Sequence, residues 1–238
     1  MKIALLGYGK MGKAIEQIAQ EKGHEVVLRI HDQNLEELTV ANLKKADVAI
    51  EFTSPQSAVS DILLCFEAGI PVVCGTTGWL AQMEKVHSAC KEKDGTFLYA
   101  SNFSIGVNIF FELNQRLAQL MNPHPDYNIS LEEIHHTEKK DAPSGTAITL
   151  AEGIMHAIPR KNKWVNHATG VPEELGIVSK RVDPAAGTHS VRYTSGIDDI
   201  EITHTAHNRK GFASGAVLAA EFIAGKKGIF SMKEVLGF

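Results

Sequence analysis

The sequence has few cysteines, no long uncharged hydrophobic run and no excess of positive charge, and each shortage excludes a class of protein. Its three cysteines, Cys65, Cys74 and Cys90, are odd in number and lack CxxC spacing, so we expect neither a disulfide framework nor a zinc site. No uncharged stretch reaches the roughly 18 to 20 apolar residues that a membrane-spanning helix requires. The chain enters the strand-like run Ile3 to Leu6 without the basic and apolar regions of a secretory signal, which predicts a cytosolic protein.

The balance of charge indicates small-molecule partners. With 24 Lys and Arg against 28 Asp and Glu, the net charge is −4 at pH 7. Nucleic acids and anionic membranes are bound by clustered basic residues, so we expect no nucleic-acid partner and no membrane partner. A chain of 238 residues that is 44% hydrophobic is long enough for one large domain or two small ones, each with a buried core.

A glycine-rich turn near the N-terminus lies between a predicted strand, Lys2 to Leu6, and a predicted helix, Lys13 to Lys22. The turn consists of Gly7, Tyr8, Gly9, Lys10, Met11 and Gly12. In this GxGxxG pattern the first glycine permits a tight turn, the second lets a pyrophosphate approach the backbone, and the third lets the helix pack against its strand. The helix N-terminus then offers N–H groups to phosphates. A plain turn before a helix is the alternative interpretation.

An acidic residue after the second predicted strand, Glu25 to Ile30, supports the dinucleotide interpretation. Asp32 follows the last glycine at the distance of about 20 residues at which a ribose-binding acid is expected. Because a carboxylate repels a 2′-phosphate, Asp32 favours NADH over NADPH. The neighbouring Arg29 and His31 would weaken this preference.

Strands and helices then alternate, which predicts a parallel sheet covered by helices on both faces. The expected strands are Ala46 to Phe52, Pro71 to Cys74 and Phe97 to Ala100, and the expected helices are Pro55 to Ala68 and Leu80 to Lys91. Small or polar residues follow each strand, namely Thr53 and Ser54, then Gly75, Thr76 and Thr77, then Ser101 and Asn102. Ligands bind at the carboxyl ends of strands in such sheets, so these residues predict a cofactor site, although any one Thr or Ser would serve equally as a helix cap.

The most polar part of the sequence follows a predicted helix, Val107 to Met121, and a predicted strand, Tyr127 to Ile134. An acceptor of hydride from a nicotinamide must also take up a proton. The side chains able to donate one near neutral pH are His at its ordinary pKa and Lys when burial or neighbouring cations lower its pKa, and His135 and Lys139 supply both kinds. A solvated loop with two ordinary histidines is the alternative.

A second helix, from Gly145 to Ala157, is expected to begin at the N-cap Ser144. Its first amides, those of Gly145 and Thr146, would form a carboxylate site beside the histidines and lysines. A metal site made of His135, His136 and Glu138 is disfavoured, because adjacent histidines on a strand point to opposite faces, and we expect no metal.

Three further strands, Gly176 to Val182, Thr188 to Thr194 and Ile200 to Ala206, are separated by short turns and predict an antiparallel meander. With the strand ending at Ile134 they would form a mixed, largely antiparallel sheet, and the apolar helix Phe212 to Ala224 would return to the first domain. The predicted organisation is α/β. It combines an N-terminal Rossmann domain of residues 1–104 and 209–238 with an α+β domain of residues 105–208, which would close about hinges near Ser104 and Asn208, beside Arg209.

Six segments resemble the 4-hydroxy-tetrahydrodipicolinate reductase family, also called dihydrodipicolinate reductase, over nearly the whole chain. They are GYGKMG at 7–12, EFTSP at 51–55, CGTTG at 74–78, ASNFSIGVN at 100–108, EIHHTEKKDAPSGTA at 133–147 and EITHTAHNRKGFASGAV at 201–217. The fifth segment is the most specific. The resemblance implies NAD(P)H-dependent reduction of 4-hydroxy-tetrahydrodipicolinate to tetrahydrodipicolinate in lysine and diaminopimelate biosynthesis, with loss of water and delivery of hydride to ring carbon 4.

The resemblance also implies roles for particular residues. It places NADH or NADPH on residues 7–12, Asp32, residues 75–77 and the segment Ala100, Ser101, Asn102 and Phe103. It makes His135 and Lys139 the proton donors and assigns His136, Gly145 and Thr146 to the dicarboxylate substrate. It further implies a homotetramer, for which the strands of the second domain offer alternating apolar residues, namely Ile177, Val191, Tyr193, Ile200 and Ile202.

The chain departs from the family pattern in two places. The glycine turn is one residue shorter than in many members, so the resemblance does not carry over phosphate contacts for Tyr8 and Lys10. The segment Arg29 to Asp32 differs from the usual one, which leaves the coenzyme preference open between NADH and NADPH. Two other functions compete with this interpretation. A related two-domain amino-acid or semialdehyde dehydrogenase would need its own reactive group, and Cys74 ends a predicted buried strand. A non-catalytic NAD(P)H sensor would not need the proton-donor cluster.

Overall fold

The computed structural model describes residues 1–208 and 210–238. The chain forms two compact units, Met1–Ile105 with Lys210–Phe238, and Gly106–Arg209. Arg209, where we placed the start of a returning segment and a hinge, lies outside the described residues. No helix of the described part is long and apolar enough to cross a membrane.

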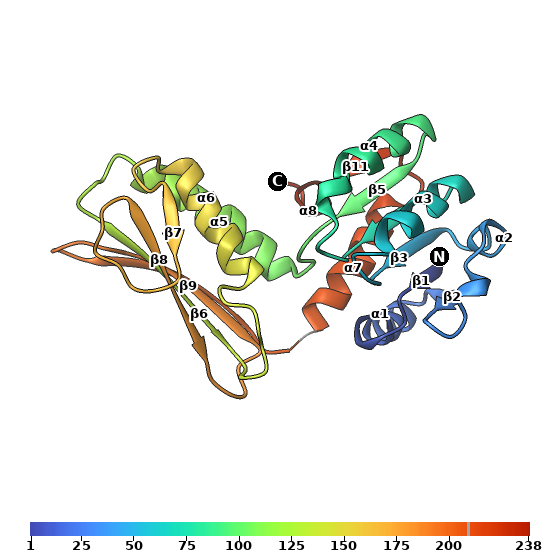
Figure 1. The fold of residues 1–238 in the computed structure, drawn as a ribbon, viewed down its shortest axis with the longest axis horizontal. Helices are drawn as coiled ribbons and strands as arrows, with labels where there is room; N and C mark the ends of the chain where they lie inside the picture. The colour runs from blue at the N-terminus through green and yellow to red at the C-terminus, as the bar shows by residue number, and fades with distance from the viewer. Residues whose placement is uncertain (209) are drawn as a thin grey trace. The chain divides into compact units, whose positions relative to one another are not determined.

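The first unit contains a six-stranded parallel sheet in the order β11-β5-β4-β3-β1-β2 (Figure 1). The strands are β1 Lys2–Leu6, β2 Glu25–Ile30, β3 Val48–Glu51, β4 Val72–Cys74, β5 Thr96–Tyr99 and β11 Gly228–Phe230. The helices are α1 Lys10–Glu21, α2 Val40–Leu43, α3 Ala58–Ala68, α4 Met83–Glu92, α7 Lys210–Ile223 and α8 Met232–Leu236, with short 3-10 turns at Leu35–Glu37 and Leu80–Gln82. The predicted Rossmann arrangement is confirmed, whereas β11, α2 and α8 were not predicted.

Strand β1 shows why this sheet is buried on both faces. Ala4 and Leu6 point into a core shared with α2, α3 and α4, whereas Ile3 and Leu5 point into a second core shared with α1 and α7. Successive side chains of a strand alternate between faces, so a continuous apolar run can serve two helical layers. The sheet therefore stands between two layers of helices, and the loops that follow its strands share one edge.

The second unit contains a five-stranded mixed sheet in the order β10-β9-β6-β8-β7. The strands are β6 Asn128–His135, β7 Lys163–Val165, β8 Glu174–Arg181, β9 Gly187–Thr194 and β10 Asp199–Ala206, and the helices are α5 Ile105–Met121 and α6 Gly145–Ala157 (Figure 1). Both helices contribute to a core on one face of the sheet. The predicted second domain with a mixed sheet is present.

The predicted antiparallel meander is wrong in one respect. β8 does not pair with β9, because β6 lies between them, parallel to β8 and antiparallel to β9. Leu131 at the centre of β6 pairs with Ile177 on one side and with Val191 on the other. Only β9 and β10 form the expected hairpin. The short turn after β8 resembles a hairpin turn locally, but pairing of strands is decided by which faces can be buried together.

The apolar residues that we assigned to an oligomer interface divide into two groups. Ile177, Val191 and Tyr193 are fully buried in the core under α5 and α6 and are not available to a partner. Ile200 is 38% exposed, and Ile202 is only partly buried. Of the expected interface residues, only Ile200 and Ile202 on β10 are therefore accessible to a partner.

Candidate active site

The glycine turn is shaped by close approaches of backbone. A Cβ atom on Gly7, whose φ is +92°, would lie 1.9 Å from the carbonyl oxygen of Phe52, and one on Gly12 would lie 2.4 Å from the carbonyl oxygen of Gly7. These two glycines are required by packing. A Cβ on Gly9 would meet no described atom within 4 Å, so this glycine faces open space at the start of α1. That combination fits a pyrophosphate at the helix N-terminus.

Two hollows flank this turn. One, of about 560 Å³, is lined by Gly7, Tyr8, Gly9, Ile30, His31, Asp32, Leu35, Leu38, Phe52, Thr53, Ser54, Ser57 and Asp61. The other, of about 520 Å³, is lined by Gly9, Lys10, Met11, Phe52, Thr53, Pro55, Gly75, Thr76 and Thr77. They share the residues Gly9, Phe52 and Thr53, and their sizes suit the parts of a dinucleotide.

The other expected cofactor residues have varied environments. Ser101 is exposed and Ala100 is partly buried at the end of β5. Asn102 is buried and its side chain accepts a hydrogen bond from the amide of Ser104. Phe103 is 2% exposed and its ring packs against that of Phe52, with centroids 5.7 Å apart. Phe103 therefore supports a residue that lines both hollows.

A buried carboxylate that sequence analysis missed holds two of these loops together. Glu51, at the end of β3, accepts hydrogen bonds from the backbone amide of Thr53 at 2.8 Å, from Thr76 Oγ1 at 2.7 Å and from Cys74 Sγ at 2.8 Å. It is fully buried. The only signal in the sequence is an acid at the end of a strand that is otherwise apolar.

Asp61 lies on α3 beside this carboxylate and lines the larger hollow. Burial, together with the charge of Glu51, raises the pKa of Asp61 to about 6, although Thr53 Oγ1 donates a hydrogen bond to it at 3.2 Å. The hollow that Asp32 lines is therefore also lined by Asp61, and the charge of Asp61 changes near neutral pH.

Arg29 is held away from the hollow that Asp32 lines. Its guanidinium hydrogen-bonds to Glu16, with Nε at 2.9 Å, and the hydroxyl of Tyr8 donates to the same carboxylate. No lysine or arginine is among the residues that line the larger hollow in the described chain. Arg29, which we expected to weaken the preference for NADH over NADPH, is thus already paired with Glu16.

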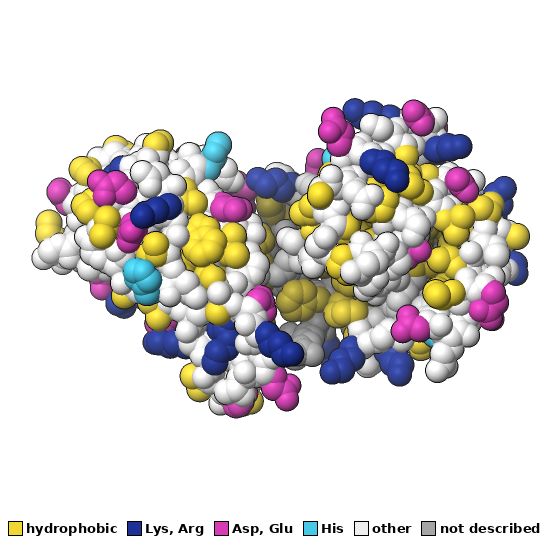
Figure 2. All heavy atoms as spheres, in the orientation of Figure 1, with side chains coloured by type: hydrophobic (Ala, Val, Ile, Leu, Met, Phe, Trp, Pro, Cys, Tyr) yellow, Lys and Arg dark blue, Asp and Glu magenta, His cyan; other side chains and the backbone are white. Residues whose placement is uncertain are grey.

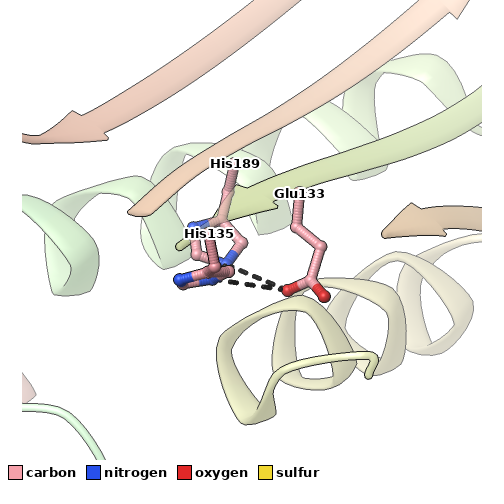
Figure 3. A group of neighbouring side chains, drawn as sticks. All are labelled: Glu133, His135 and His189. Atoms are coloured by element: carbon pink, nitrogen blue, oxygen red, sulfur yellow. Dashed lines mark hydrogen bonds and ion pairs between the residues drawn. The ribbon is translucent and has the colours of Figure 1, made fainter. Parts of the chain in front are cut away.

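The second unit brings together three side chains from two strands. Glu133 and His135 lie two residues apart on β6, and His189 lies on β9 directly across from Glu133. Figure 3 shows the two imidazole rings directed toward one carboxylate. Glu133 Oε2 lies 3.5 Å from His135 Nε2 and 3.6 Å from His189 Nε2, and the two Nε2 atoms are 3.4 Å apart. Sequence analysis identified only His135.

The alternation of β6 explains why these polar groups point inward. Ile129, Leu131 and Glu133 are all buried on the face that carries the core, and His135 follows on the same face at the strand end. An acid on the core face of a strand was therefore a signal for Glu133. Burial alternates along β9 in the same way, and His189 lies on the buried face together with Gly187 and Val191. Nothing in the sequence indicated that the two strands would be neighbours.

Ser144 connects this group to the expected carboxylate site. Its hydroxyl accepts a hydrogen bond from the amide of Ala147 at 3.2 Å, which confirms it as the N-cap of α6. Its own amide donates to both oxygens of Glu133 at 3.1 Å. A Cβ on Gly145 would meet no described atom within 4 Å, so this first residue of α6 faces open space. Thr146 lies in the same turn.

The loop after β6 carries the basic residues. Lys139 Nζ lies 2.7 Å and 2.8 Å from the two carboxylate oxygens of Asp141. Arg181, which sequence analysis missed, donates to the carbonyl oxygens of Lys139 and Asp141 and to Glu133 Oε1, the last at 3.2 Å. His136 follows the end of β6 directly and is partly buried. Lys and Arg side chains gather on the surface of this unit near the ends of β6 and β8 (Figure 2).

The ligand atoms of Glu133, His135 and His189 all lie within 4.8 Å of one another, close enough to share a metal ion. Arg181 already neutralises the single carboxylate, and a divalent cation would lie uncompensated beside it. His136 and Glu138, the other ligands that we considered, do not belong to this group within the described chain. We assign no metal ion here, and the expectation of a metal-free site stays a prediction.

Family models of dihydrodipicolinate reductase match both parts of the chain. The model of the N-terminus matches residues 1–103, and the model of the C-terminus matches residues 106–236. The chain belongs to the dihydrodipicolinate reductase family. The predicted family, the reductase activity and the use of NADH or NADPH are thereby confirmed.

Relatives of this reductase cover nearly its whole length. The 4-hydroxy-tetrahydrodipicolinate reductase of Christiangramia forsetii is 50% identical over 236 residues, which are 99% of this chain and 98% of the relative. That of Methanosarcina acetivorans is 36% identical over 241 residues, 99% of this chain and 89% of the relative. A solved structure, dipicolinate-bound dihydrodipicolinate reductase from Paenisporosarcina sp. TG-14, superposes with a TM-score of 0.77 at 23% identity and covers 97% of both chains, which shows the shared fold.

Proposed function

We propose that this chain reduces 4-hydroxy-tetrahydrodipicolinate to tetrahydrodipicolinate, a step of lysine and diaminopimelate biosynthesis. The observation that carries the proposal is the 50% identity to the Christiangramia forsetii enzyme over 99% of this chain. The overall reaction consumes the substrate, reduced coenzyme and one proton, and releases water and oxidised coenzyme. The alternatives of another dehydrogenase and of a coenzyme sensor have no comparable support.

The first unit is the proposed binding site of the coenzyme. Gly9 and the N-terminus of α1 would receive the pyrophosphate, and Asp32 would bind the adenosine ribose. Residues 75–77 and 100–103 would hold the remaining part of the dinucleotide. The bound coenzyme supplies the hydride, so the protein itself has to supply the proton and hold the substrate.

The second unit is the proposed binding site of the substrate. The amides of Gly145 and Thr146 at the start of α6 would bind one carboxylate, and His136 would contribute to the other contacts. His135 and Lys139 would donate the proton that the electron-rich ring requires after reduction. The contact of Lys139 with the exposed Asp141 supports a place for the ammonium group beside the substrate, because a substrate carboxylate can replace that partner.

A coupled assay tests the proposed activity. Freshly generated 4-hydroxy-tetrahydrodipicolinate is added to the purified protein with NADH or NADPH, and the absorbance of the reduced nicotinamide is followed. We expect oxidation of the coenzyme that depends on both substrates and is inhibited by pyridine-2,6-dicarboxylate. Absence of turnover with both coenzymes in folded protein would remove the proposed function. His135→Gln is measured in the same assay, because the role of the second unit depends on it.

We further propose that the enzyme is a cytosolic homotetramer that associates through β10. This strand is at the edge of its sheet, pairs only with β9 among the described residues, and exposes Ile200. An unpaired strand edge with exposed apolar side chains is usually covered by another element or by a second copy. Sedimentation velocity at micromolar concentration tests the assembly, and a fully active monomer would contradict it. Fractionation of the producing cells tests the cytosolic location.

A further inference from the structure

Glu133 is the most completely buried charged group of the proposed substrate site, and the proposed reaction gives it no role. Burial alone would raise the pKa of Glu133, but hydrogen bonds from His135, His189 and Ser144 bring it far below its usual range. Arg181 Nη2 donates to its Oε1 at 3.2 Å, and the amide of Ser144 contacts both of its oxygens at 3.1 Å. Glu133 is therefore a permanent anion whose oxygen Oε2 faces two imidazole rings.

The protonation of His189 follows from its surroundings. Burial lowers the pKa of His189, and the neighbouring Glu133 only partly offsets this, so the ring is neutral and carries one N–H. Its Nδ1 has no hydrogen-bond partner among the described residues. Its Nε2 faces Glu133 Oε2 at 3.6 Å and Ser144 Oγ at 3.1 Å. A buried donor without a partner costs about 1–3 kcal/mol, which places the proton on Nε2.

We propose that Glu133 and His189 are positioning residues that fix the ring of His135 and leave its Nδ1 as the atom that delivers the proton. This inference rests on the proposed function, in which His135 is a proton donor. His135 Nε2 is turned toward the carboxylate at 3.5 Å. A carboxylate that accepts from one ring nitrogen selects the tautomer and directs the other nitrogen to the substrate. His189 lies beside that contact and holds Glu133 Oε2 in place.

The proton balance of this arrangement is simple. In protonated His135, the Nδ1–H bond breaks and the proton joins the electron pair that reduction leaves on the substrate ring. The Nδ1 lone pair stays on a neutral imidazole, whose Nε2–H remains directed at Glu133. Glu133 remains ionised throughout, and His189 neither gains nor loses a proton. Water then restores the proton on Nδ1 before the next turnover.

Steady-state kinetics of four variants test the proposal. A positioned acid contributes about 10²- to 10⁴-fold to rate, so we expect Glu133→Gln to lower kcat about 10²-fold and His189→Leu about 10-fold. His189→Gln should recover most of the activity, because its amide N–H reaches the place of Nε2. The Kd for NADH should not change. Glu132→Gln is the matched control, because Glu132 lies one residue away and pairs with Lys180 at 2.6 Å on the outer face of the sheet.

A double variant and one spectroscopic measurement separate positioning from folding. Glu133→Gln combined with His135→Gln should be no slower than His135→Gln alone, because Glu133 acts through that ring. Nitrogen-15 NMR of histidine-labelled protein should show the neutral His135 ring protonated on Nε2, with mixed tautomers in Glu133→Gln. The His135 signal is assigned by its loss in His135→Gln.

The outcomes distinguish this inference from the proposed function. A wild-type kcat in His135→Gln would show that His135 is not the proton donor, and it would contradict the proposed role of the second unit. A slow His135→Gln variant alongside wild-type rates in Glu133→Gln and His189→Leu would overturn the positioning role alone. If Glu133→Gln does not fold, the comparison of His189→Leu with His189→Gln tests the proposal instead. Equal activity of these two variants would overturn it. A wild-type His135 ring protonated on Nδ1 in its neutral form would do the same.

Discussion

Gly187 lies against the imidazole ring of His135. A Cβ atom on Gly187 would come within 2.9 Å of His135 Cε1 and within 3.3 Å of Nδ1. The first residue of β9 therefore limits where the proposed proton donor can stand. A side chain on residue 187 would therefore meet the ring of His135, and the φ of +157° at this position also favours glycine.

We expect Gly187→Ala to push the ring of His135 aside and lower kcat about 10- to 100-fold, because small displacements of a catalytic group have large effects on rate. The Kd for NADH should stay normal, since the proposed coenzyme residues lie on the other unit. Gly196→Ala is the control, because a Cβ there would meet no described atom within 4 Å. Wild-type kcat in a folded Gly187→Ala variant would show that the position of this ring does not matter.

The acid chemistry and the binding of substrate should separate in the loop after β6. Lys139→Ala should lower kcat steeply, and Lys139→Arg should not restore it, because a guanidinium stays protonated at any working pH. Thr146→Val should mainly raise the KM for substrate. Lys140→Ala, which removes an exposed neighbour of the same charge, is the control. Full activity of Lys139→Arg would show that Lys139 acts only through its charge.

The coenzyme preference should depend on Asp32. Its carboxylate lines the larger hollow and Arg29 is paired with Glu16, so we expect NADH to be preferred and a 2′-phosphate to be repelled. Asp32→Ala should reduce the ratio of kcat/KM for NADH over NADPH about tenfold. Glu36→Ala, in the exposed turn that follows, is the control. An unchanged ratio would exclude Asp32 as the selecting residue.

The stability of the first unit should fall as pH rises between about 4 and 6 because of Asp61. The pKa of Asp61 is raised to about 6, so in this window the folded chain keeps a proton that the unfolded chain, with an Asp pKa of about 3.9, has released. Stability contributed by that proton is present below the window and lost above it.

Asp61→Asn should remove this dependence and increase the free energy of unfolding at pH 7.5 by on the order of 1–3 kcal/mol. Urea denaturation at pH 4.5 and pH 7.5 measures both effects, with the exposed Asp126→Asn as control. The same variant should lose any rise in the Kd for NADH between pH 5 and pH 7, because the second carboxylate of the hollow is gone. Parallel stability curves for wild type and Asp61→Asn would contradict the assignment.

Local chemistry and periodicity were enough to predict the first unit and part of the second. The strand, glycine turn and helix at residues 2–21 follow from residue types alone, because Gly7 and Gly12 admit backbone contacts that a Cβ would prevent. The cap at Ser144 likewise depends on residues only a few positions apart. These features placed the proposed coenzyme turn, His135 and the start of α6 before any tertiary information.

Only the tertiary structure decided that β6 stands between β8 and β9. That order places His189 opposite Glu133, although the two are 56 positions apart along the chain. It also brings Arg181, which is 48 positions from Glu133, to the same carboxylate. Pairing of strands distant in sequence depends on which faces are buried together, and no short stretch of residues encodes it. The sequence by itself thus determined the residue types of the site, and the packing of the second sheet determined which of them contact one another.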